Sequence, residues 1–118
     1  SSLERLEATQ TSMTDRACQT FVSRFPFLRD VSLAQTEVKD EGVIRVCNSL
    51  RRLEKLDLSR TQVSNESIPH LTSLNSLRAL TLNQTQVIPT ESTSLNFASM
   101  TALETLKLQD LEKYSVFK

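Results

Sequence analysis

The sequence predicts an α/β repeat protein in which each unit supplies one strand and one short helical segment. Two observations support this prediction: an apolar phrase recurs at a nearly constant spacing, and the second half of each unit stays in phase with it. A fixed period of about 20 to 50 residues is typical of stacked repeats, because one small unit cannot bury an apolar face alone. The fold class is therefore set by the repeat before any local element is considered.

The first half of each unit is a Leu-x-x-apolar-x-apolar phrase. In the third unit, Leu56 and Leu58 alternate with the polar residues Asp57 and Ser59, and the other units repeat this arrangement. Apolar positions that alternate with polar ones indicate a strand with one buried side. The sequence therefore predicts about five strands, in units that are 25, 25, 24 and 26 residues apart and begin at Leu3, Leu28, Leu53, Leu77 and Leu103.

A threonine follows the predicted strand at the same offset in four units. An apolar residue follows each of these threonines two positions later. Because a buried hydroxyl needs a hydrogen-bond partner, we expect these side chains to bond to the backbone of the adjacent turn. The predicted structural ladder consists of Thr11, Thr36, Thr61 and Thr85.

The second half of each unit predicts a short helix or helical turn. Asp15, Asp40 and Asn65 share an offset just before an apolar position, and these residue types are favoured as helix N-caps. Pro69 predicts less helix in the third unit, because proline beyond the first turn loses a helical hydrogen bond. Gly42 is the one glycine in the chain, so we expect the turns to rely on Asn, Ser, Thr and Asp.

These residues resemble the leucine-rich repeat family. The family phrase L-x-x-L-x-L stands in this chain as Leu53-Glu54-Lys55-Leu56-Asp57-Leu58, and the resemblance covers nearly the whole sequence. Many members carry Asn or Cys where this chain has threonine, so it is similar to a threonine variant of intracellular, substrate-receptor type. The resemblance implies a right-handed solenoid with parallel strands on a concave face and short helices or turns on a convex face.

The repeat pattern weakens at the two ends. Leu111 stands where a fifth threonine would be expected, and Leu3 opens a unit with no capping segment before it. Uncapped ends expose apolar core to water. Two interpretations follow for the C-terminal end: the tail with Tyr114, Val116 and Phe117 folds over the last turn as a cap, or further repeats follow. We expect residues 1–118 to form a single repeat domain that belongs to a longer array.

The composition points to a protein partner. Lys plus Arg and Asp plus Glu each total 14, which gives no bulk electrostatic signal for nucleic acid or an anionic membrane. No apolar stretch approaches the roughly 20 residues that span a bilayer, so no membrane insertion is expected. Cys18 and Cys47 do not resemble a disulfide framework, so we expect an intracellular, cytoplasmic protein.

Catalysis, metal binding and cofactors are not expected. The chain has one histidine, His70, and no serine or cysteine at a recognisable nucleophile spacing. His70, Cys18 and Cys47 fall at different offsets and would not converge on a metal. Four phenylalanines lie at or beside core offsets, so we expect them to pack in the core: Phe21, Phe25, Phe27 and Phe97. The basic pair Arg51-Arg52 has no aromatic stacking partner beside it, so we expect it to form a solvated edge.

Polar strand positions are the candidate binding surface. Two interpretations remain open: Arg5, Asp30 and Lys55 neutralise one another across neighbouring strands, or a mixed-charge patch fixes the register of a partner. The patch would centre on Asp30, Lys55, Asp57 and Arg60. The full set of candidate protein-binding residues is Asp30, Lys55, Asp57, Arg60, Asn83 and Lys107.

The function expected from these features is that of a non-catalytic scaffold that binds a protein on its concave strand surface. One alternative is the substrate-recognition arm of a ubiquitin-ligase adaptor, although the sequence contains no ligase-docking motif. A second alternative is a structural subunit of a large ribonucleoprotein or membrane complex. That subunit would make its contacts through the convex side and the ends, within a larger multi-subunit assembly.

Overall fold

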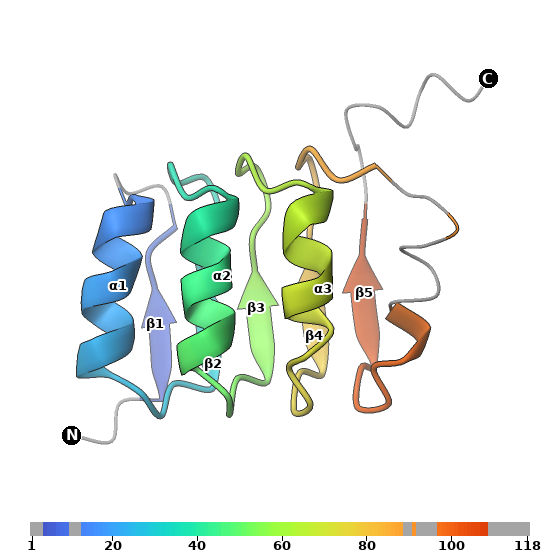
Figure 1. Ribbon diagram of the computed structural model, residues 1–118, viewed down its shortest axis with the longest axis horizontal. Coiled ribbons are helices and arrows are strands. Elements are labelled where there is room, and N and C mark those ends of the chain that lie inside the picture. Colours follow the sequence, from blue (N-terminus) through green and yellow to red (C-terminus); the bar gives the residue numbers. More distant parts are fainter. Residues whose placement is uncertain (1–3, 10–12, 89–90, 92–96, 109–118) are drawn as a thin grey trace.

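The computed structural model describes residues 4–9, 13–88, 91 and 97–108. Strands and helical segments alternate along the chain, and the helices form one layer that covers one side of the sheet (Figure 1). In order, the elements are β1 (Arg5–Glu7), α1 (Asp15–Arg24), β2 (Asp30–Ser32), α2 (Asp40–Ser49), β3 (Lys55–Asp57), the 3-10 helix η1 (Asn65–Ser67), α3 (Ile68–Leu71), β4 (Ala79–Thr81) and β5 (Thr105–Lys107).

The five strands form one open parallel sheet in the order of the sequence, β1 to β5, which confirms the parallel strands expected. Equivalent residues of successive units lie opposite each other, so Asp30 pairs with Arg5 on one side and Lys55 on the other. A carbonyl before each of the first four strands accepts two N–H groups from the next unit: the Glu4 oxygen lies 2.7 Å from the Arg29 nitrogen and 2.9 Å from the Asp30 nitrogen. The sheet register therefore follows the repeat register.

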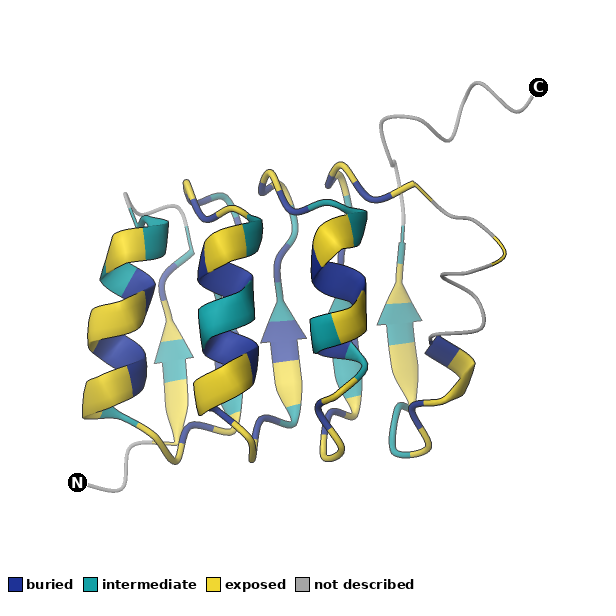
Figure 2. Cartoon of the chain, in the orientation of Figure 1, coloured by how far each residue is buried: buried dark blue, intermediate teal, exposed yellow. Residues whose placement is uncertain are grey.

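The apolar residues of the strands and helices form one core between the two layers (Figure 2). At the central strand position, Val31, Leu56 and Leu80 are 1%, 2% and 0% exposed. Leu6 and Leu106 hold the same position in β1 and β5, and both are only partly buried. The core is thus continuous through the three middle strands and thinner at the two outer ones.

The helical segment of the third unit is shorter than those of the first two, as Pro69 predicted. α1 and α2 each have 10 residues, whereas the third unit has a 3-residue 3-10 helix followed by the 4-residue α3, which carries Pro69 in its first turn. The shorter third helix is confirmed. Much of the fourth segment, residues 89–90 and 92–96, lies outside the described residues, as do Leu3 and Leu111.

The predicted N-caps are wrong by one residue. The cap positions are Thr14, Lys39 and Ser64, and the three predicted residues each begin the helical segment instead. Their side chains accept hydrogen bonds from the next unit. Asp15 Oδ1 lies 2.6 Å from the Lys39 nitrogen, Asp40 Oδ1 lies 2.8 Å from the Ser64 nitrogen, and Asn65 Oδ1 lies 2.7 Å from the Ile88 nitrogen.

The threonine ladder is buried as expected, but its partners differ from the prediction. The Thr36, Thr61 and Thr85 hydroxyls donate to the Leu33, Leu58 and Leu82 carbonyls at 2.6, 2.6 and 2.9 Å. Each bond closes the turn of its own unit, so the expected bond to the adjacent unit is wrong. Thr11 lies outside the described residues.

The turns rely on threonine, as expected, but their left-handed positions are taken by residue types that the composition did not suggest. Gln35, Arg60 and Gln84 precede the ladder threonines, and their φ angles are 58°, 58° and 57°, in the left-handed region. Backbone bonds between units hold this shape, since the Gln35 and Arg60 N–H groups donate to carbonyls of the next unit at 2.9 Å. Three non-glycine residues thus adopt a conformation that costs roughly 1–2 kcal/mol each.

Gly42 has a packing role rather than a turn role. It is buried in the first turn of α2, where a Cβ atom would lie 2.5 Å from Asp15 Oδ1 and 3.1 Å from Asp15 Cα. The same Asp15 oxygen accepts the bond from Lys39. Glycine therefore lets α1 and α2 approach closely enough for that bond to form.

Candidate functional site

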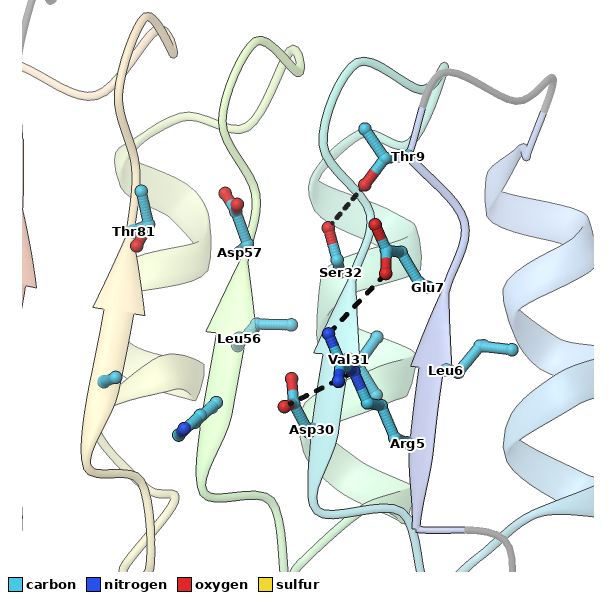
Figure 3. A pocket seen from close by; sticks show the side chains of 12 residues that line it. Arg5, Leu6, Glu7, Thr9, Asp30, Val31, Ser32, Leu56, Asp57 and Thr81 are labelled. Atoms are coloured by element: carbon cyan, nitrogen blue, oxygen red, sulfur yellow. Dashed lines mark hydrogen bonds and ion pairs between the residues drawn. The ribbon is translucent and has the colours of Figure 1, made fainter.

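The strand face, defined here as the side of the sheet away from the helices, contains a shallow hollow over β1 to β4 (Figure 3). Because parallel strands lie about 4.8 Å apart, equivalent side chains of successive units form straight rows across this face. The residues that line the hollow include Arg5, Glu7, Thr9, Asp30, Ser32, Lys55, Asp57, Ala79 and Thr81.

Ion pairs occupy the β1 side of the hollow. Arg5 Nε lies 3.8 Å from Asp30 Oδ2, and Arg5 Nη2 lies 3.7 Å from Glu7 Oε1 (Figure 3). The Arg5 side chain is 72% exposed, so water screens both contacts and each contributes little to stability. The lateral neutralisation predicted for this row is present between Arg5 and Asp30.

The other charges of the strand face have no such partner. Within the described residues, the Lys55 and Lys107 ammonium groups and the Arg60 guanidinium form no ion pair. Asp57 also has no ionic partner, and its Oδ1 accepts the N–H of Ser59 at 3.0 Å. Four of the six candidate residues therefore carry a charge that is available to another molecule.

The structure brings only part of the predicted set together. Asp30, Lys55 and Asp57 line the hollow. Lys107 lies in the same row as Asp57, two strands further along. Arg60 and Asn83 lie in the turns that follow β3 and β4, where the Arg60 N–H donates to the Asn83 carbonyl at 2.9 Å. The hollow also includes Arg5, Glu7 and Ser32, which the candidate set omitted although they share its rows.

A row of alternating charge just before the strands was also missed. The Arg29 guanidinium lies 3.8 Å from the Glu54 carboxylate, and Arg78 Nη2 lies 3.0 Å from Glu104 Oε2. Comparing the second residue of every unit would have found this row, because its sign changes at each step. In chain order the row is Glu4, Arg29, Glu54, Arg78 and Glu104.

Two expectations are wrong: that Phe27 packs in the core, and that the basic pair Arg51-Arg52 has no aromatic partner. Phe27 is 47% exposed, whereas Phe21 and Phe97 are buried and Phe25 packs against the core. The Arg52 guanidinium carbon lies 5.0 Å from the centroid of the Phe27 ring. The basic pair therefore has an aromatic partner after all, supplied by the loop of the preceding unit.

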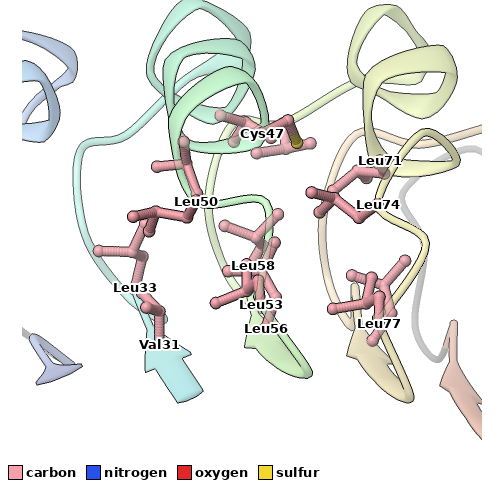
Figure 4. Close-up of a cluster of buried hydrophobic side chains, with 14 of the residues drawn as sticks. Val31, Leu33, Cys47, Leu50, Leu53, Leu56, Leu58, Leu71, Leu74 and Leu77 are labelled. Atoms are coloured by element: carbon pink, nitrogen blue, oxygen red, sulfur yellow. The ribbon is translucent and has the colours of Figure 1, made fainter. Parts of the chain in front are cut away.

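The two cysteines belong to the core. Cys18 and Cys47 are free and 0% exposed, and Cys47 lies among leucines of the second and third units (Figure 4). Burial raises the pKa of each thiol from 9.0 to about 12. Across the residues that the structure describes, no three His, Cys, Asp or Glu side chains are grouped to hold a metal. The thiols are packing groups at neutral pH.

Comparisons with protein-family models and with curated proteins found no match. In the described part of the chain, no helix has the length and apolar character needed to cross a bilayer.

Proposed function

We propose that the chain is a non-catalytic scaffold module that binds a protein partner on its strand face. We also propose that its units are leucine-rich repeats wound into a solenoid, with the strand face concave. The single observation that supports binding most directly is the hollow across β1 to β4, which charged and polar side chains line in fixed rows beside a few apolar residues. Because these rows follow the register of the sheet, they form a rigid surface on which a partner can align.

The chemistry of the hollow favours recognition by charge. Arg5, Glu7, Asp30, Lys55 and Asp57 supply both signs, while the described part of the hollow includes no Trp, Tyr or Phe. Aromatic anchors dominate the affinity of many tight interfaces, whereas complementary charges mainly set specificity and association rate. The proposed interface is therefore selective and sensitive to salt.

The proposal includes an intracellular setting and membership of a longer repeat array. The two free, buried thiols support a reducing compartment. The partly exposed apolar positions of β1 and β5 support further packing at the ends of the described sheet.

The test uses affinity purification of the parent protein followed by quantitative mass spectrometry. One variant changes Asp30, Lys55, Asp57 and Arg60 to Ala, which removes two charges of each sign. A matched control changes Arg16, Arg24, Glu37 and Glu41 to Ala, which removes the same charges outside the strand face. Circular dichroism must first show that both variants fold as the wild type does.

We expect the strand-face variant to lose at least one discrete partner that the control retains. An unchanged set of partners in the strand-face variant would contradict the proposal. Loss of partners in the control alone would instead favour contacts through the helical layer, as expected for a structural subunit of a large complex.

A further inference from the structure

The unpaired charges of the strand face are mainly cationic, and they flank one neutral strand. Lys55 lies on β3, Arg60 lies in the turn after β3, and Lys107 lies on β5. Between them, β4 presents Ala79 and Thr81, which are small and uncharged. The other strand-side cations, Arg5, Arg29 and Arg78, are all engaged by carboxylates.

The register sets the dimensions of this cationic strip, which we define as Lys55, Arg60 and Lys107 with the β4 floor between them. Lys55 pairs with Ala79 across β3 and β4, and Thr81 pairs with Lys107 across β4 and β5. Since strands lie about 4.8 Å apart, β3 and β5 are roughly 10 Å apart. That span lets long cationic side chains on both sides reach a segment laid over β4.

We propose that the cationic strip binds an acidic segment of a protein partner, whose carboxylates pair with Lys55, Arg60 and Lys107. The proposal rests on the proposed function, and it adds the chemistry of the partner. Charge complementarity supports it, because among the residues that the structure describes three unpaired cations are available there, against one unpaired carboxylate, that of Asp57.

Asp57 favours a protein segment over a nucleic acid as the ligand of the cationic strip. Its carboxylate lies on β3 between Lys55 and Arg60 along the chain, Asp30 lies on the neighbouring strand β2, and Glu7 lies one strand further away on β1. A continuous phosphate backbone would meet these carboxylates and be repelled. A peptide can instead alternate acidic residues with donor or basic residues, so that a donor faces Asp57 while carboxylates face the cations.

The experiment selects random peptides displayed on phage against the immobilised wild-type chain. We expect the selected peptides to be enriched in Asp and Glu over the input library and to bind more weakly as salt is added. The charge-reversed variant Lys55→Glu/Arg60→Glu should lower the affinity of these peptides about tenfold or more. The matched variant Arg16→Glu/Arg24→Glu changes the net charge equally on α1 and should leave the affinity unchanged.

A second variant, Thr81→Tyr, distinguishes failure of this inference from failure of the proposed function. It fills the floor of the strip without changing charge and should also block the peptides. Thr81→Tyr could block peptides that are not enriched in Asp and Glu, or peptides whose affinity the charge-reversed variant leaves unchanged. Either result would show that the inference of an acidic partner is wrong, while binding on the strand face would be supported. If no selected peptide is sensitive to Thr81→Tyr, the acidic partner over β4 is wrong, and the affinity purification with the strand-face variant decides the proposed function separately.

Two further outcomes would overturn the acidic partner alone. One is a loss of affinity in Arg16→Glu/Arg24→Glu as large as that in Lys55→Glu/Arg60→Glu, which would show that binding depends on the net charge of the chain. The other is binding of a single-stranded oligonucleotide to the wild-type chain in competition with the peptides. Circular dichroism spectra and unfolding midpoints of all variants show whether each is folded.

Discussion

The ladder threonines repeat one hydrogen bond in successive units. The hydroxyls of Thr36, Thr61 and Thr85 satisfy carbonyls just after β2, β3 and β4, and the leucines that carry those carbonyls are fully buried. A buried acceptor without a partner destabilises the folded state more than a single hydrogen bond stabilises it. Threonine at this offset is therefore a structural requirement of each turn.

The variant Thr61→Val should lower the free energy of unfolding by about 1–3 kcal/mol, because it keeps the side-chain shape but leaves the Leu58 carbonyl unpaired. Urea unfolding followed by circular dichroism measures the effect. Thr72→Val is the matched control, since the exposed Thr72 hydroxyl donates to the Pro69 carbonyl at 2.9 Å. The control should cost less than about 0.5 kcal/mol. Equal losses in the two variants would contradict the role of the ladder.

The left-handed residues show what residue types alone do not predict. The positions of Gln35, Arg60 and Gln84 in the repeat are visible in the sequence, but their positive φ angles are not. Glutamine and arginine carry no chemical preference for this conformation, which glycine, asparagine and aspartate adopt most readily. At Gln35 and Arg60 hydrogen bonds to the next unit hold the conformation, and a single unit of sequence does not contain that information.

At the scale of the elements, Asp40 joins α2 to the helical segment of the next unit. Its carboxylate accepts from the Ser64 nitrogen at 2.8 Å, from Ser64 Oγ at 2.5 Å and from Ser67 Oγ at 2.6 Å. Ser67 is fully buried. One side chain therefore satisfies three donors at the start of η1 and fixes the spacing of the two helical segments.

The variant Asp40→Ala should lower the free energy of unfolding by about 2–3 kcal/mol, because it leaves polar donors unpaired beside the core. The neighbouring variant Glu41→Ala is its control. Glu41 forms an exposed ion pair with Arg45 at 3.1 Å, and its loss should cost about 0.5 kcal/mol or less. Chemical unfolding curves of the two variants give the comparison, and a cost for Glu41→Ala as large as that for Asp40→Ala would refute this account.

The starts of the helical segments show why the sequence predicted where Asp15, Asp40 and Asn65 lie but not what their side chains bind. An acidic or amide residue just before an apolar one fits the cap position and the first helical position equally well. The choice depends on whether the side chain can reach an N–H of the next unit, which Asp15, Asp40 and Asn65 all do. The shortening at Pro69 was predictable because a missing N–H is a property of that residue alone.

For the whole molecule, the sequence predicted the strands and their register because both follow from the period of the repeat. The candidate surface was predicted in part: Asp30, Lys55 and Asp57 line the hollow, whereas Arg60 and Asn83 lie in the turns beyond it. The exposure of side chains in the loops between units was the property that the sequence predicted least well. Phe27 sits beside a core offset, yet its ring faces Arg52 in the loop of the next unit.

The buried thiols predict how the whole molecule responds to alkaline pH. Burial raises the pKa of Cys18 and Cys47 from 9.0 to about 12, and for Cys18 the charge of Asp15 adds to the effect. A thiol whose pKa is higher in the folded state contributes stability that is fully present below its unfolded pKa. That contribution should be lost as the pH rises from 9 towards about 12.

Thiol labelling followed by mass spectrometry measures this prediction. At neutral pH both cysteines should react with a thiol reagent only as fast as the fold opens, and denaturant should accelerate the reaction. Unfolding midpoints measured at pH values between 9 and 12 should fall progressively. Immediate, complete labelling of the native chain would show that the thiols are accessible and that this account is wrong.

The alternating row before the strands bears on the order in which the units assemble. Since the units share one apolar pattern, that pattern alone would accept a strand placed beside the wrong unit. A chain that skipped one unit would bring Glu4 beside Glu54, or Arg29 beside Arg78, and like charges on neighbouring strands are destabilising. The correct order instead joins Arg29 to Glu54 and Arg78 to Glu104. The row thus distinguishes odd from even units during folding, which the leucines cannot do.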